Sequence, residues 1–129
     1  MRILIVEDNK DIAEVYKAWL EDEGHEVVSL TNGIEALTLI TKIYSENTGN
    51  AFDAYIIDYH LPSASGEKIY DILKTLEWKK DKHPLVLISG DSTALDQLTG
   101  NIHKLEKPIS KEDLFDTLEL INNFSKSIL

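Results

Sequence analysis

Five polar side chains lie at or just after the ends of apolar segments of the chain: Glu7, Asp8, Asp58, Ser89 and Lys107. Three of them are carboxylates, and two like charges about 4 Å apart repel by about 4 kcal/mol at an effective dielectric constant of about 20. Three carboxylates therefore converge comfortably only if a hard cation neutralises them, and Mg²⁺ prefers such oxygen ligands. The Ser89 hydroxyl and the Lys107 ammonium group complete a set that is suited to phosphoryl chemistry, in which a metal and a lysine offset developing charge.

Two kinds of apolar segment alternate along the chain and predict the elements that position these residues. Short, continuous runs rich in Ile, Leu and Val are typical of strands that are covered on both faces. The expected strands are Ile3–Val6, Glu26–Leu30, Ala54–Ile57, Leu85–Ile88 and a weaker Ile102–Leu105. Apolar residues that recur every three or four positions predict helices between them. Their expected inward faces are Ile12, Val15, Tyr16, Trp19 and Leu20; Ile34, Leu37, Ile40 and Tyr44; Ile69, Ile72, Leu73 and Leu76; and Leu114, Leu118 and Ile121. A further short helix is expected around Ala94–Leu98. The last helix opens at Ser110–Asp113, which has the pattern of a capping box.

Five strands and five helices in strict alternation predict an α/β fold. Right-handed crossovers then favour a doubly wound parallel sheet with helices on both faces, a flavodoxin-like arrangement with strand order 2-1-3-4-5. Neither a linker nor an internal repeat interrupts the pattern, so residues 1–129 are expected to form one domain. In such sheets ligands bind beyond the carboxyl ends of the strands, where the five polar residues should gather.

Composition narrows the function further. The 129 residues carry a net charge of −10, from 23 acidic residues against 13 Lys and Arg, which disfavours nucleic-acid binding by this chain. The absence of cysteine removes disulfides and thiol nucleophiles. No apolar run is long enough to cross a bilayer and the amino terminus lacks the apolar core of a signal peptide. A soluble, cytoplasmic protein without membrane contact is expected.

Each motif also has a plain structural interpretation. Glu7-Asp8 could only cap the following helix, and Asp58 could be a turn residue. Ser89-Gly90 is a common loop start, and Lys107-Pro108 could be a surface lysine before a turn. What favours chemistry is that four strand ends, in this order, all supply groups suited to phosphoryl transfer.

These motifs together resemble the receiver domains of two-component response regulators, over essentially the whole chain. Val6-Glu7-Asp8-Asn9 resembles the acidic pair of that family, and Asp58-Tyr59-His60-Leu61-Pro62 with Gly66 resembles its phosphoacceptor strand and loop. Leu87-Ile88-Ser89-Gly90 and Glu106-Lys107-Pro108 resemble its hydroxyl-bearing strand and its lysine-proline signature.

The resemblance implies roles for the same residues. Asp58 is the nucleophile that takes a phosphoryl group from a phosphohistidine. The carboxylates of Asp8 and Asp58 and the backbone carbonyl of His60 ligate Mg²⁺, while Glu7 acts through a metal-bound water. Lys107 pairs with a phosphoryl oxygen, and Ser89 moves to bond another. Such a domain catalyses its own phosphorylation and dephosphorylation rather than acting as an enzyme on a separate substrate.

The resemblance also implies partners: a histidine kinase or histidine phosphotransfer protein as donor, and a downstream protein or fused output domain as target. The chain itself is expected to be a monomer or weak dimer. Whether it acts alone or is a piece of a longer regulator or hybrid kinase stays open.

Two departures from the family pattern concern its activation switch, in which the ring of an aromatic residue on the fifth strand moves inward. Lys104, with His103 beside it, stands where the family usually carries an aromatic residue three positions before the lysine. The stretch between Ser89 and Gly100 is about one helical turn shorter than usual. Both departures call the family's aromatic switch and usual dimer mode into question. His25, His83 and His103 are expected to be surface or boundary residues, not metal ligands.

Three other classes fit less well. A flavodoxin-like flavin or nucleotide-binding protein needs a phosphate-binding loop after the first strand, where this chain has the acidic Glu7-Asp8-Asn9. A haloacid-dehalogenase-like phosphatase needs Asp-x-Asp at that place. A degenerate receiver, which works only as an interaction module, does not require the intact Asp8, Asp58, Ser89 and Lys107.

Overall fold

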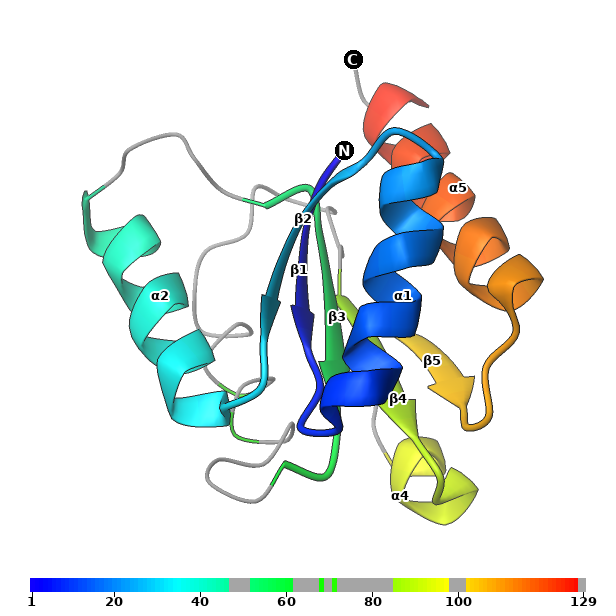
Figure 1. Cartoon of the computed structure of the whole chain (residues 1–129), viewed down its shortest axis with the longest axis horizontal. Coiled ribbons are helices and arrows are strands. Elements are labelled where there is room, and N and C mark those ends of the chain that lie inside the picture. Colours follow the sequence, from blue (N-terminus) through cyan, green and yellow to red (C-terminus); the bar gives the residue numbers. More distant parts are fainter. Residues whose placement is uncertain (47–51, 62–67, 69–70, 72–84, 98–101, 128–129) are drawn as a thin grey trace.

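A five-stranded parallel sheet forms the centre of the molecule (Figure 1). The computed structural model describes residues 1–46, 52–61, 68, 71, 85–97 and 102–127. The strands are β1 (Arg2–Val6), β2 (Glu26–Leu30), β3 (Ala54–Asp58), β4 (Leu85–Ser89) and β5 (His103–Glu106). All neighbouring pairs are parallel and lie in the order β2-β1-β3-β4-β5, which confirms the predicted topology.

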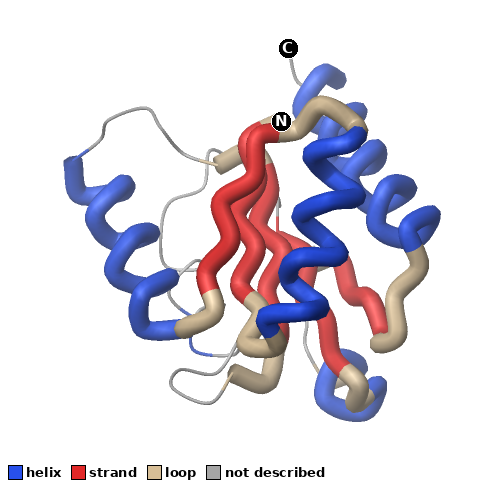
Figure 2. The backbone as a smooth tube through the Cα atoms, in the orientation of Figure 1, coloured by secondary structure: helices blue, strands red, loops and turns tan. Residues whose placement is uncertain are grey.

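Helices cover both faces of this sheet. They are α1 (Lys10–Asp22), α2 (Gly33–Glu46), α4 (Ser92–Asp96) and α5 (Lys111–Ser127). The fifth expected helix, around Ile69–Leu76, falls almost wholly outside the described residues. Figure 2 shows α1 and α5 on one side of the strands and α2 on the other, which is the doubly wound arrangement. Within the described part of the chain, no helix is long and apolar enough to cross a membrane.

The alternation of side chains along the strands divides the core into two layers. One layer joins Ile3 and Ile5 of β1 to α1 and α5; the other joins Leu4 and Val6 to α2 and α4. We call these the α1/α5 layer and the α2/α4 layer. Because successive strand residues point to opposite faces, the position of a strand-end residue in this alternation determines which of the two layers its side chain faces.

Two helix faces differ from the prediction. Val15 is 45% exposed and Ile34 is 55% exposed, although both were expected to point inward. In α1 the buried stripe runs through Ala13, Tyr16 and Leu20, so Val15 lies off it. In α2 the buried residues include Ala36 and Ile40. In both helices a small alanine packs toward the sheet. In the sequence, an alanine indicates an inward face less strongly than the large β-branched residue two positions away.

The helix starts follow the local sequence. Asn9 caps α1, where its Oδ1 accepts a hydrogen bond from Ile12 N at 3.1 Å. Ser110 accepts one from Asp113 N at 3.0 Å, the serine half of the predicted capping box. The predicted inner face of α5, Leu114, Leu118 and Ile121, is buried.

Candidate functional site

Strand alternation brings three of the predicted residues to one face of the sheet. Asp58 continues the β3 series that contains Ala54 and Ile56 of the α1/α5 layer. Glu7 continues the corresponding series of β1, and Lys107 that of β5. Ser89, at the end of β4, follows the opposite alternation and faces the α2/α4 layer. Glu7, Asp58 and Lys107 are therefore positioned to meet, with Ser89 approaching from the other face.

Backbone hydrogen bonds extend the sheet beyond the strand ends and fix these side chains. Glu7 N donates to Leu30 O at 3.1 Å, Tyr59 N to Ile88 O at 2.9 Å, and Lys107 N to Ser89 O at 2.8 Å. The peptide bond between Lys107 and Pro108 is cis. Because the ladder continues through the functional positions, the site rests on the rigid part of the fold rather than on free loops.

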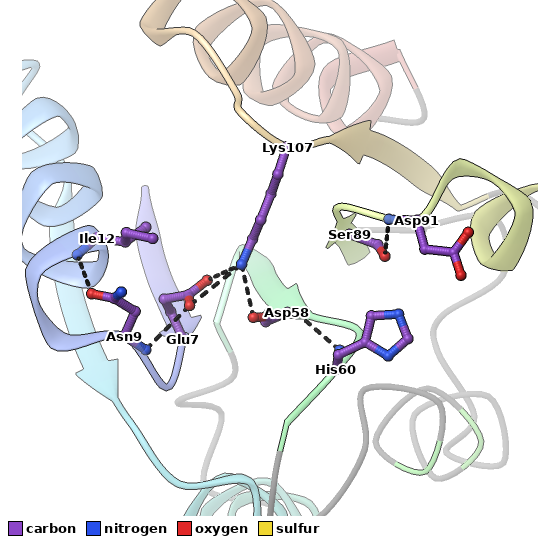
Figure 3. Close-up of polar contacts among 8 residues, drawn as sticks. All are labelled: Glu7, Asn9, Ile12, Asp58, His60, Ser89, Asp91 and Lys107. Carbon is purple, nitrogen blue, oxygen red and sulfur yellow. Dashed lines mark hydrogen bonds and ion pairs between the residues drawn. The ribbon is translucent and has the colours of Figure 1, made fainter.

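Lys107 bridges two buried carboxylates (Figure 3). Its Nζ lies 2.9 Å from Asp58 Oδ2 and 3.1 Å from Glu7 Oε2. Glu7 and Asp58 are 2% and 4% exposed, so both charges are held almost out of water. Such a pair of acids is tolerable only with a counter-charge in contact, and the ammonium of Lys107 supplies one.

A third carboxylate joins them at the surface. Oxygen atoms of Glu7, Asp8 and Asp58 lie within 4.8 Å of one another, and Asp8 is exposed where the other two are buried. Although Glu7 Oε2 lies within ion-pair distance of Lys107, its geometry makes no hydrogen bond, so this buried oxygen has no hydrogen-bond partner among the described residues. Three carboxylates share one ammonium here, which leaves a net negative site of hard oxygen ligands. The residues present therefore fit Mg²⁺.

The electrostatics of the site follow from this crowding. Burial, and then the charge of Asp58, raise the pKa of Glu7 from its usual 4.5 to about 7. For Lys107, burial by itself would lower the pKa, but hydrogen bonding and attraction to Asp58 and Glu7 outweigh it and the pKa is raised. Tyr16, buried on α1, has its pKa raised by burial and by the charge of Glu7. Lys107 is thus charged, and Glu7 is the group whose ionised form is disfavoured.

Glu7 should make the metal-free protein less stable as the pH rises. Its pKa is higher in the folded than in the unfolded chain, so the folded state binds more protons between pH 4.5 and about 7. The favourable contribution is present below pH 4.5 and is lost as the pH rises through 7. We expect a loss on the order of 2 kcal/mol between pH 5 and pH 8 in chelator, measured by urea unfolding. Glu7→Gln should flatten this dependence, while Glu14→Gln, which removes an exposed carboxylate on α1, should retain it. A wild-type slope in Glu7→Gln would contradict the assignment.

The remaining predicted residues surround this centre. Ser89 is fully buried, and its Oγ accepts a hydrogen bond from Asp91 N at 2.9 Å. His60 is exposed; its backbone N–H donates to Asp58 Oδ1 at 3.0 Å, and its ring packs edge-on against Tyr59. Lys104 is half-buried on β5.

No histidine side chain belongs to a possible metal site in the part of the chain that the structure describes. The single group of three or more possible ligands found there is Glu7, Asp8 and Asp58. His25 instead contacts the amino terminus, with Nδ1 3.0 Å from Met1 N. His83 lies outside the described residues.

The motif did not reveal the part that Asn9 takes in the site. Besides capping α1, its backbone N–H donates to Glu7 Oε1 at 3.2 Å, so the start of the helix also holds the buried glutamate (Figure 3). An asparagine directly before a helical segment is a capping signal that could have indicated this position.

The fold and the site together define a doubly wound α/β domain with a cluster of carboxylates and one lysine at the carboxyl edge of its parallel sheet. The chain belongs to the response regulator receiver domain family, which it matches over residues 3–119.

Individual relatives agree with this assignment. The cell cycle response regulators CtrA of Brucella ovis and Brucella suis biovar 1 are each 30% identical to the chain over 130 residues, which cover 98% of the chain and 52% of those proteins. The chain thus spans about half the length of these relatives. A receiver domain (CheY-like) from Methylobacillus flagellatus is 29% identical with a TM-score of 0.70. The receiver domain of the hybrid histidine kinase CckA is 30% identical with a TM-score of 0.68. Each of these two structures covers 94% of this chain, which covers 98% of each of them.

Proposed function

We propose that this receiver domain accepts a phosphoryl group on Asp58 in a reaction that depends on Mg²⁺. The observation that carries the proposal is the position of Lys107 Nζ, 2.9 Å from Asp58 Oδ2, beside a three-carboxylate cluster whose Glu7 Oε2 lacks a hydrogen-bond partner. This combination provides a nucleophile, a fixed positive charge and a place for a cation at one point of the sheet edge.

The donor in this proposal is a phosphohistidine of a histidine kinase or histidine phosphotransfer protein. A carboxylate oxygen of Asp58 forms the new P–O bond while the P–N bond to the donor imidazole breaks, and the imidazole leaves with its electron pair and takes up a proton. Lys107 is placed to stabilise negative charge on a phosphoryl oxygen, since it already contacts the acceptor carboxylate. Burial of Asp58 restricts the reaction to donors that can reach into the site.

Asp8, Asp58 and the His60 backbone carbonyl would hold Mg²⁺, with Glu7 acting through a bound water. Bound there, the ion would neutralise phosphoryl and carboxylate oxygens together. Ser89 would bond a phosphoryl oxygen once the group is attached. The phosphorylated domain would then act on a downstream protein or on an output domain fused to it, as the longer relatives suggest.

A degenerate receiver that only binds partners is the second candidate, and a phosphoryl analogue distinguishes the two. With Mg²⁺ present, wild type should bind one beryllofluoride per chain. ¹⁹F NMR measures this binding. Without Mg²⁺, or in Asp58→Asn, binding should be lost. Asp53→Asn serves as the matched control, because it removes an exposed carboxylate just before the opposite end of β3. If wild type failed to bind in millimolar Mg²⁺, the competent-receiver proposal would be wrong.

A further inference from the structure

Strand β2 forms an open edge of the sheet (Figure 1). Among the described strands it pairs with β1 alone. Glu26 N donates to Met1 O at 2.9 Å, so Glu26 and every second residue after it turn their backbone groups toward β1. The residues between them, Val27 and Ser29, therefore direct their N–H and C=O groups to the open edge, where they can pair with another chain.

The two edges of the sheet differ in how they are protected. Native proteins commonly place charged residues or proline on an edge strand, which prevents the strand from pairing with another chain. At the opposite edge, β5 follows this rule with His103, Lys104 and Glu106 among its four residues. β2 has its single charge at its first residue, Glu26, and continues as the uncharged run Val-Val-Ser-Leu. Of the two edges, β2 is thus the one that can accept a further strand.

The side chains of β2 also leave apolar surface for such a strand to cover. Val27, Val28 and Leu30 are only half-buried, whereas Ile3–Val6 of the neighbouring β1 are fully buried. Val27 packs against the α1/α5 layer, and Val28 and Leu30 pack against the α2/α4 layer. A strand added beside β2 would therefore bury apolar side chains on both faces of the sheet.

Acidic side chains are concentrated where the chain enters β2. They are exposed and lie at the end of α1, in the turn and on the first residue of the strand: Glu21, Asp22, Glu23 and Glu26. The last turn of α1 contains no basic residue, so negative charge there opposes the helix dipole and costs stability. Gly24, with a φ of 89°, is in the turn that brings these acids to the amino end of the edge strand.

We propose that the open edge of β2 binds an extended, basic segment of a partner protein, which adds to the sheet as a further strand. Backbone hydrogen bonds to Val27 and Ser29 hold the segment, and its lysine or arginine side chains lie beside the acidic entry to β2. The ion pairs that two of these acids make with Lys17 and Arg2 are at the surface and are 3.7 and 3.8 Å long, so they neutralise the acids only weakly. A second copy of this chain fits less well, because each copy carries a net charge of −10.

An NMR titration with a peptide of alternating lysine and valine tests this proposal and needs no phosphodonor. The amide signals of Val27 and Ser29 should shift, and at saturation their hydrogen exchange should slow by about fivefold or more, the factor that corresponds to one hydrogen bond of ordinary net strength. Binding should weaken in about 0.5 M salt, which screens exposed charges. A peptide of alternating glutamate and valine is the matched control and should not bind.

Ser29→Pro removes an outward N–H group without removing a hydrogen bond to β1, a substitution that edge strands tolerate. It should bind the lysine–valine peptide about tenfold more weakly than wild type, whereas Ser29→Ala, which retains the N–H group, should bind as wild type does. The double variant Asp22→Asn, Glu23→Gln changes only exposed side chains and should bind about fivefold more weakly. This double variant decides the question if thermal melts show that Ser29→Pro is unfolded.

Wild-type affinity in folded Ser29→Pro would mean that the peptide is held by general attraction to an acidic surface, and the proposal would be wrong. Wild-type affinity in the double variant would equally overturn the role of the acidic entry. A dimer that forms without peptide in sedimentation experiments, and that Ser29→Pro abolishes, would identify a second copy of this chain as the occupant and contradict a basic partner.

Discussion

Replacing Lys107 with methionine should destabilise the metal-free protein by about 3 kcal/mol at pH 8, because it leaves two buried carboxylates without their counter-charge. In the folded chain Lys107 Nζ is within 3.1 Å of both Glu7 and Asp58, and the two acids are held by the sheet and cannot separate. For a domain of this size the loss corresponds to a melting temperature lower by about 10 °C. The effect should shrink toward pH 5, where Glu7 takes up a proton.

A surface lysine provides the matched control for this change. Lys17 pairs with Glu21 at 3.7 Å along α1, and the two side chains are 40% and 50% exposed. Lys17→Met should cost less than about 0.5 kcal/mol, as exposed pairs generally do. Equal, small losses for the two variants in thermal melts would show that Lys107 does not neutralise the buried acids.

Magnesium should raise the melting temperature of wild type by several degrees. A ligand that binds only the folded state stabilises it by about 2.7 kcal/mol at a hundredfold excess over its dissociation constant. Glu7, Asp8 and Asp58 bring their oxygens within 4.8 Å of one another, so the cation also removes repulsion that the fold cannot relax. The measurement is a thermal melt in chelator and in millimolar Mg²⁺.

Asp8→Asn separates repulsion from ligation in the same experiment. The variant loses one repelling charge and one ligand, so it should melt slightly higher than wild type in chelator and gain little from Mg²⁺. Asp53→Asn removes an exposed carboxylate just before the amino-terminal end of β3, away from the site, and should keep the full Mg²⁺ shift. A full shift in Asp8→Asn would mean that the three carboxylates do not share a metal.

The sheet and the centre of the site could be predicted from sequence because both depend on strong, local signals. Strands that are buried on both faces must be apolar throughout, so Ile3–Val6 and Ala54–Ile57 stand out, and the charged residues Glu7 and Asp58 mark where they end. The right-handed crossover then fixes which strand ends meet.

The features that could not be predicted depend on atomic contacts between segments. Apolar spacing allowed more than one inward face, and it placed Val15 and Ile34 wrongly because small alanines pack against the sheet instead. The bond from Asp91 to Ser89 Oγ depends on a side-chain rotamer, which no residue pattern specifies. The extra hydrogen bond from Asn9 to Glu7 likewise depends on the angle at which α1 leaves β1.

Asp58 as the phosphoacceptor is tested most directly by the intact mass of the protein after incubation with acetyl phosphate and Mg²⁺. Wild type and Asp53→Asn should each gain one phosphoryl group, chelator should prevent the gain, and Asp58→Asn should not gain mass. Peptide mapping should place the modification on Asp58. A phosphoryl group mapped to Asp8 or to a histidine, or an undiminished mass gain in Asp58→Asn, would contradict the assignment.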